Sequence, residues 1–177
     1  MNPETFSLPA RMGRLLFRVR AILGVIGFAL LLYLGKPRID TLLNSLTLII
    51  PGLLLRFWTA GYIGPESRRR QITASRIVVD GPYRYFRHPL YLGNFALVAG
   101  FIVALHPPVL LGLGILAGFL LIYGLISRAE TEFLNQSGLE PVATNFNSHY
   151  ALLEWQTWVL VALGFVFTLL KLLFFRT

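Results

Sequence analysis

The feature that most constrains the fold is a run of 39 residues, Pro89 to Ser127, that contains no Lys, Arg, Asp or Glu. As one helix this run would be about 58 Å long at roughly 1.5 Å per residue. The hydrocarbon core of a bilayer is about 30 Å thick and takes roughly 20 apolar residues. The run is therefore long enough for two membrane crossings. We expect the break at His106-Pro107-Pro108, because a proline pair cannot continue a helix.

The composition supports a membrane protein. Only 14% of the residues are charged, 55% are hydrophobic and the mean hydropathy is +0.66, whereas a soluble domain carries about 25% charged residues. We expect an all-α, polytopic membrane helix bundle that forms one domain over residues 1–177, with about five transmembrane helices. The expected spans cover residues 15–35, 41–64, 89–105, 108–127 and 155–175. The absence of cysteine excludes disulfides, thiolate catalysis and cysteine-zinc sites, and we expect no metal.

The basic residues predict the orientation in the membrane. With the N-terminus inside, eleven of them lie in cytosolic segments and four in outside segments, which is the usual positive-inside bias. The cytosolic set is Arg11, Arg14, Arg18, Arg20, Arg68, Arg69, Arg70, Arg76, Arg84, Arg87 and Arg128, and the outside set is Lys36, Arg38, Lys171 and Arg176. Both long polar segments, residues 65–88 and 128–154, are then cytosolic, and we expect any chemistry there. Because most arginines flank apolar runs, the net charge of +8 indicates contact with lipid headgroups rather than nucleic acid.

The most specific segment is Gly81-Pro82-Tyr83-Arg84-Tyr85-Phe86-Arg87-His88-Pro89-Leu90-Tyr91-Leu92-Gly93. Here Pro89 can occupy the first turn of a helix, where its missing N–H costs nothing. The free N–H groups and partial positive charge of that helix N-terminus favour an anion, and Arg87 and His88 lie beside it. Gly93, one turn further, would let a flat group approach the backbone. Taken alone, these residues also fit interfacial anchors around an ordinary helix start.

The pattern Gly81-Pro82-Tyr83-x-x-x-Arg87-His88-Pro89-x-Tyr91-x-Gly93 resembles the signature of the isoprenylcysteine carboxyl methyltransferase and phospholipid methyltransferase superfamily of integral membrane enzymes. The resemblance extends upstream to Leu55-Arg56-x-Trp58 and downstream to Glu130-x-x-x-Leu134, and so covers about residues 50–135. It implies that S-adenosylmethionine is the cofactor and that a methyl group is transferred to a lipophilic acceptor, such as a lipid or isoprenoid, at the cytosolic membrane face. The alternative is a non-enzymatic lipid-binding or scaffold protein of the membrane with a decayed methyltransferase site.

The resemblance also implies the residues of the cofactor site. These are Ser75, Arg76, Ile77, Val78, Tyr83, Arg87, His88, Pro89, Leu90, Tyr91, Gly93 and Glu130. The chemistry of the cofactor agrees, because its carboxylate suits Arg87, His88 and the helix N–H groups. Its ammonium and sulfonium suit Glu130, and its adenine suits the tyrosines.

The sequence departs from the family pattern in the part expected to bind the methyl acceptor. The second Glu of the family's Glu-Glu pair is Thr131 here, and Glu132 follows one position later. In the carboxyl methyltransferases an arginine four residues before the cofactor-binding Glu handles the substrate, and that position is Ile126 here. The acceptor therefore stays open among a phospholipid amine, an isoprenoid carboxylate or thiol, and a small hydrophobic metabolite.

Arg56, Arg128 and Glu130 are the candidate catalytic residues. Arg56 lies within the second expected span, where an ionisable residue usually faces the protein interior and marks a site. The alternative is an arginine that extends its side chain to the nearby cytosolic surface. We expect the arginines to orient an anionic acceptor, and Glu130 or Glu132 to serve as the base for an ammonium acceptor.

Overall fold

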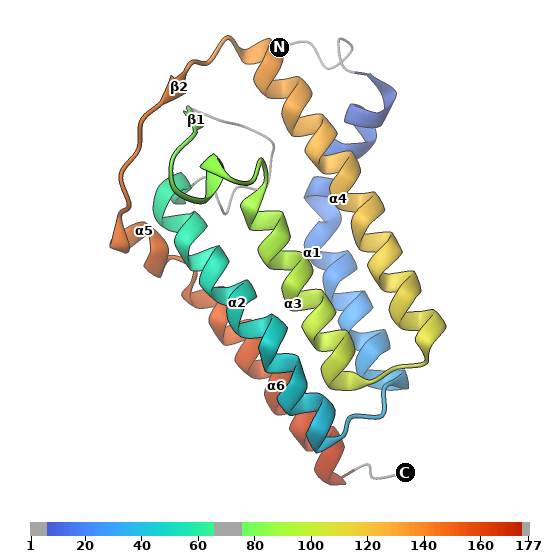
Figure 1. Cartoon of the computed structure of the whole chain (residues 1–177). Helices are drawn as coiled ribbons and strands as arrows, with labels where there is room; N and C mark the ends of the chain where they lie inside the picture. Colours follow the sequence, from blue (N-terminus) through green and yellow to red (C-terminus); the bar gives the residue numbers. More distant parts are fainter. Residues whose placement is uncertain (1–6, 66–75, 175–177) are drawn as a thin grey trace.

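The computed structural model describes residues 7–65 and 76–174, which form a bundle of long helices (Figure 1). The long helices are α1 (Leu8–Leu34), α2 (Ile39–Ile63), α3 (Pro89–Leu105), α4 (Val109–Ser137) and α6 (Trp155–Phe174). Within the described residues, four helical segments are long and apolar enough to cross a membrane, and α3 is a shorter apolar helix of 17 residues. The expected all-α, polytopic bundle with about five spans is confirmed.

The helix ends follow the prolines. Helix α3 ends at Leu105 and α4 begins at Val109, so the break falls at the proline pair. His106 closes α3 in the left-handed conformation, with φ of 45°, which turns the chain sharply back. Helix α1 begins at Leu8, with Pro9 in its first turn. It therefore starts before the expected span, and the arginines of the N-terminal cluster lie on the helix itself.

Glycines allow the helices to pack closely. A Cβ atom at Gly13 of α1 would lie 2.2 Å from the carbonyl oxygen of Leu125 in α4. A Cβ atom at Gly100 of α3 would lie 2.4 Å from Cγ1 of Ile49 in α2. Small residues at such positions let two helix backbones approach each other, which drives helix association within a membrane. The bundle therefore contains two closely packed pairs, α1 with α4 and α2 with α3.

The shorter elements gather at one end of the bundle (Figure 1). They are β1 (Ile77–Val78), η3 (Gly81–Arg84), β2 (Pro141–Val142) and α5 (Ser148–Leu152). Strands β1 and β2 pair in parallel, and the N–H of Thr144 donates to Asp80 Oδ2 at 2.8 Å. The N–H of Asn147 donates to the Gly61 carbonyl at 2.9 Å. The segment after α4 is thus tied both to the segment before α3 and to the end of α2.

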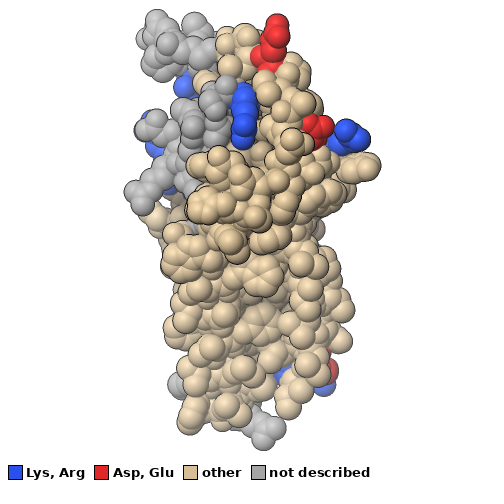
Figure 2. All heavy atoms as spheres, turned by 90° about the vertical axis from the view of Figure 1, so that its left-hand side faces the viewer, with Lys and Arg blue, Asp and Glu red and all other residues tan. Residues whose placement is uncertain are grey.

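The charged side chains visible on one face of the molecule lie near its two ends (Figure 2). On the face shown in Figure 2, the Lys, Arg, Asp and Glu side chains gather near the ends and leave an uncharged band between them. At the end opposite the short elements, Lys171 of α6 donates hydrogen bonds to the carbonyls of Leu32 and Tyr33, the latter at 2.9 Å. These carbonyls belong to the last turn of α1, whose oxygens have no partner within the helix. The arrangement is that of a multi-pass membrane protein.

Candidate functional site

Three residues of the expected cofactor site meet where α3 begins. His88 is the residue before α3 and Tyr91 follows within its first turn, and their rings stack with centroids 5.4 Å apart and planes 13° apart. Glu130 of α4 reaches both side chains. Its Oε2 lies 3.4 Å from His88 Nδ1, and its Oε1 accepts a hydrogen bond from the Tyr91 hydroxyl. A carboxylate, an imidazole and a phenol therefore form one partly buried cluster.

A second tyrosine links this cluster to the centre of the bundle. Tyr123 lies seven residues before Glu130, two helical turns earlier on the same side of α4. The edge of one ring packs on the other between Tyr91 and Tyr123, with centroids 4.9 Å apart and planes at 70°. The Tyr123 hydroxyl accepts a hydrogen bond from Nδ2 of Asn94 at 3.2 Å. Asn94 is three residues after Tyr91, so both side chains lie on one face of α3.

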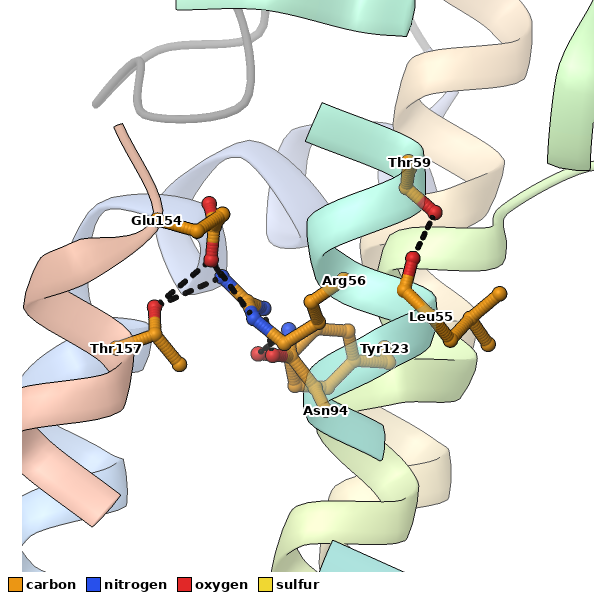
Figure 3. A network of polar contacts seen from close by, with 7 residues as sticks. All are labelled: Leu55, Arg56, Thr59, Asn94, Tyr123, Glu154 and Thr157. Carbon is orange, nitrogen blue, oxygen red and sulfur yellow. Dashed lines mark hydrogen bonds and ion pairs between the residues drawn. The ribbon is translucent and has the colours of Figure 1, made fainter. Parts of the chain in front are cut away.

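Arg56 lies inside the bundle and is held on two sides (Figure 3). Its Nε and Nη2 donate to Oε2 of Glu154 at 3.0 and 2.7 Å. Its Nη1 donates to Asn94 Oδ1, and its Nη2 also reaches Thr157 Oγ1 at 3.2 Å. The side chains of Arg56 and Glu154 are only 11% and 1% exposed. Arg56 thus faces the protein interior, and its positive charge is already paired with the carboxylate of Glu154, just before α6.

These contacts join residues from four of the long helices, α2, α3, α4 and α6. Polar contacts run from Glu154, the residue before α6, through Arg56 in α2 and Asn94 in α3 to Tyr123 in α4. Arg20 of α1 packs on a ring of its own helix, with its guanidinium carbon 3.6 Å from the centroid of the Phe17 ring. We call the set Arg56, Asn94, Tyr123, Glu154 and Thr157 the interhelical network.

The remaining expected cofactor residues lie around the same end of the bundle. Ile77 and Val78 form β1, Arg76 precedes them, and Tyr83 is half-buried in η3. Ser75 lies outside the described residues, as does the arginine triplet at 68–70. Leu90 follows Pro89, which is fully buried in the first turn of α3.

Gly93 lies against another helix. It is buried, and a Cβ atom there would lie 2.6 Å from Cγ of Arg56 and 3.1 Å from the Gly52 carbonyl oxygen. The space beside its backbone is therefore filled by α2. In this structure Gly93 serves the packing of α2 on α3.

Arg87, which precedes His88 in the sequence, and Arg128 line an open hollow with a volume of about 490 Å³. Its other walls come from the start of α1 and the last turns of α4, at Ser7, Pro9, Ser127, Thr131, Glu132 and Asn135. Both arginines are exposed. The hollow thus offers two cations with hydroxyl and amide groups, beside a carboxylate at Glu132.

The structure separates the two acidic residues that the sequence offered as bases. Glu132 accepts hydrogen bonds from the Ser7 backbone N–H at 2.8 Å and from the Ser7 hydroxyl at 2.6 Å, so it ties α4 to the start of α1. Glu130 instead contacts His88 and Tyr91 of the cluster. Ile126, at the position of the substrate arginine of the carboxyl methyltransferases, is fully buried.

The sequence reasoning did not single out Asn94, Tyr123 or Glu154. A signal was present for the first two, because polar side chains are rare in apolar spans and usually face the protein interior. Both also share a helix face with an expected site residue. Glu154 precedes α6 and looks like an interfacial acid in the sequence. Only the folded chain brings it to Arg56, 98 positions away.

Within the part of the chain that the structure describes, one ring nitrogen of His88 is free to bind a ligand. Its Nε2 is buried and has no hydrogen-bond partner among the described residues, while its Nδ1 faces Glu130. A buried polar atom without a partner is costly unless a ligand or water satisfies it. Together with the Glu130 carboxylate, this atom fits a bound molecule that carries both a hydrogen-bonding group and a positive charge.

The comparisons with known proteins identify a family for the chain. Residues 41–137, more than half of the chain, match the family described as phospholipid methyltransferase. No curated protein and no solved structure matches the chain. The matched range includes Arg56, His88, Tyr91 and Glu130, whereas α1 and α6 lie wholly outside it. The chain therefore belongs to the phospholipid methyltransferase family, within the integral membrane methyltransferases.

Proposed function

We propose that this protein transfers a methyl group from S-adenosylmethionine to a lipophilic acceptor at the cytosolic face of a membrane. The observation that carries the proposal is the convergence of His88, Tyr91 and Glu130. The three belong to two separate sequence motifs of a methyltransferase family. Their sequence neighbours Arg87 and Thr131 line an open hollow together with Arg128.

The residues of the cluster fit the cofactor. When bound, S-adenosylmethionine supplies a methyl group on a positively charged sulfur. Glu130 provides the negative charge that a sulfonium or ammonium needs, and Tyr91 and His88 hold this carboxylate in place. His88 Nε2 and the helix N-terminus at Pro89 are available to the cofactor's polar groups. Arg87, the residue before His88, suits the carboxylate of the cofactor.

The hollow supports an acceptor with a polar head. It lies between the start of α1, the end of α4 and Arg87, at the end of the bundle where a lipid headgroup would reside. Arg128 can orient an anionic part of the acceptor by charge-assisted hydrogen bonds. Attack of the acceptor's nitrogen, oxygen or sulfur on the methyl carbon requires positioning rather than a covalent enzyme intermediate.

The base, if the acceptor is an ammonium, is Glu130. Glu132 is engaged by Ser7, whereas Glu130 lies in the cluster itself. A carboxylate or thiolate acceptor needs no base. The cytosolic placement rests on the excess of arginines at this end, counted from the sequence.

Calorimetric titration of the purified protein in detergent with S-adenosylhomocysteine tests the proposal. We expect wild type to bind. Both His88→Ala and Tyr91→Ala should bind more weakly, because each removes a ring that contacts Glu130. Tyr85→Ala is the matched control, since Tyr85 lies in the same segment but is 71% exposed, and it should bind like wild type. Failure of wild type to bind at millimolar ligand would refute the enzyme assignment and favour a lipid-binding or scaffold protein.

A further inference from the structure

The ion pair between Arg56 and Glu154 joins a residue inside the range that matches the family to a residue outside it. Arg56 falls within residues 41–137, but Glu154 and Thr157 come from the C-terminal segment beyond them. Their contacts are short and buried: both Nε and Nη2 of Arg56 bond Glu154 Oε2. Thr157 donates its hydroxyl to the same oxygen at 2.9 Å. One carboxylate oxygen therefore accepts three hydrogen bonds.

We propose that Glu154 is a positioning residue for the methyl-transfer site, acting through Arg56, Asn94 and Tyr123 on the cluster of Tyr91 and Glu130. The inference rests on the proposed function and assigns a catalytic contribution to the C-terminal segment. Arg56 then serves the site by holding its neighbours, since its guanidinium is occupied by side chains of the protein.

The direction of the hydrogen bonds supports this role. An arginine can only donate, so Asn94 must present its carbonyl oxygen to Arg56. The amide nitrogen of Asn94 is then left to donate to the Tyr123 hydroxyl. The orientation of Asn94 thus depends on Arg56, and the Tyr123 ring in turn packs on Tyr91. A change at Glu154 can reach Tyr91 through contacts that are all present in the structure.

The charge of the pair explains why Glu154 in particular is needed. Arg56 is 11% exposed and lies within a membrane-spanning helix, where an unpaired cation is strongly disfavoured. Without the carboxylate, the arginine would turn toward another anion or toward water. Within the network the nearest polar partner left to it is Asn94, whose amide would then be pulled away from Tyr123.

The test compares variants that separate positioning from stability. Glu154→Gln keeps the shape but removes the charge, and Arg56→Met/Glu154→Leu removes both charges, a replacement that often leaves folding stability unchanged or improved. Lys171→Met is the matched control, because it also breaks a polar contact of α6 with another helix but at the far end of the bundle. Thermal unfolding in detergent and calorimetric binding of S-adenosylhomocysteine are measured for each. Methyl transfer from labelled S-adenosylmethionine to phosphatidylethanolamine vesicles is measured first for wild type. If wild type is active with this acceptor, each variant is measured in the same assay.

We expect Glu154→Gln and the double variant each to bind S-adenosylhomocysteine about tenfold more weakly, the range typical of coupling within one hydrogen-bonded network. Lys171→Met should lower the unfolding temperature and leave the affinity unchanged. Wild-type affinity in the well-folded double variant would overturn the inference and make the ion pair purely structural. If wild type itself does not bind, the proposed function fails and this inference fails with it, whereas unchanged binding in the variants refutes this inference alone.

Discussion

Replacing Gly93 by alanine distinguishes helix packing from contact with a ligand at this position. The added Cβ would lie 2.6 Å from Arg56 Cγ and 3.1 Å from the Gly52 carbonyl oxygen, whereas carbon atoms pack at about 3.5–4.0 Å. Helices α2 and α3 must therefore separate by about 1 Å near this point. Arg56 cannot easily give way, because Cγ is close to its backbone and its guanidinium is bound by Glu154 and Asn94.

Overpacking of this kind costs about 1–3 kcal/mol of stability, and a displacement of about 1 Å near a site can cost roughly a hundredfold in rate. We expect Gly93→Ala to lower the unfolding temperature in detergent and to weaken binding of S-adenosylhomocysteine, because Arg56 and Asn94 shift together. Gly118→Ala is the control, since a Cβ atom there meets nothing within 4 Å. Unfolding is compared at one scan rate, because membrane proteins in detergent commonly unfold irreversibly. An unfolding temperature equal to that of the control would refute the packing argument, and weaker binding at unchanged stability would instead show that a ligand approaches Gly93.

Three further predictions test the orientation, the far end of the bundle and the acceptor. In this cysteine-free chain, a thiol introduced by Asn135→Cys should resist impermeant labelling from outside, whereas one introduced by His106→Cys should react; the opposite pattern would invert the topology. Lys171→Met should lower stability by about 1 kcal/mol, as expected for lost hydrogen bonds from a charged group that remains partly solvated, and an unchanged unfolding temperature would contradict the capping role. If the acceptor is anionic, Arg128→Gln should reduce turnover roughly ten- to a hundredfold with little change in cofactor affinity, measured with labelled S-adenosylmethionine. If the acceptor is an amine, the rate should instead rise with pH as the amine loses its proton, and full activity of the variant would remove Arg128 from the acceptor site.

The fold was largely predictable because its signals are local. A helix in a membrane must satisfy its own backbone groups, so a long apolar run predicts a span and a proline pair predicts its end. The turn at His106 shows this, as does the start of α3 at Pro89. The start of α1 was less predictable, because its first turns carry arginines and resemble a polar segment that precedes a membrane span.

The cofactor cluster was predictable in its members but not in its geometry. His88 and Tyr91 lie within one turn of each other, so their proximity follows from the helix alone. Glu130 is 39 positions away from Tyr91, and its position depends on how α4 is rotated against α3. The family motif assigned Glu130 to the cofactor site but left Glu130 and Glu132 open as bases, and only the structure shows that Glu130 faces the cluster whereas Glu132 bonds Ser7.

By itself the sequence determined the number of long helices, the end of the bundle at which the polar segments gather, and the family motif at the start of α3. Only the tertiary structure decided what the buried charges do. Arg56 could have faced the surface or a ligand, and Glu154 could have been an interfacial acid. Their pairing exists because Gly52 and Gly93 bring α2 onto α3 and because the C-terminal segment returns to the end of α2. Such contacts depend on the rotation and height of each helix, which are set by packing between distant segments rather than by any local pattern.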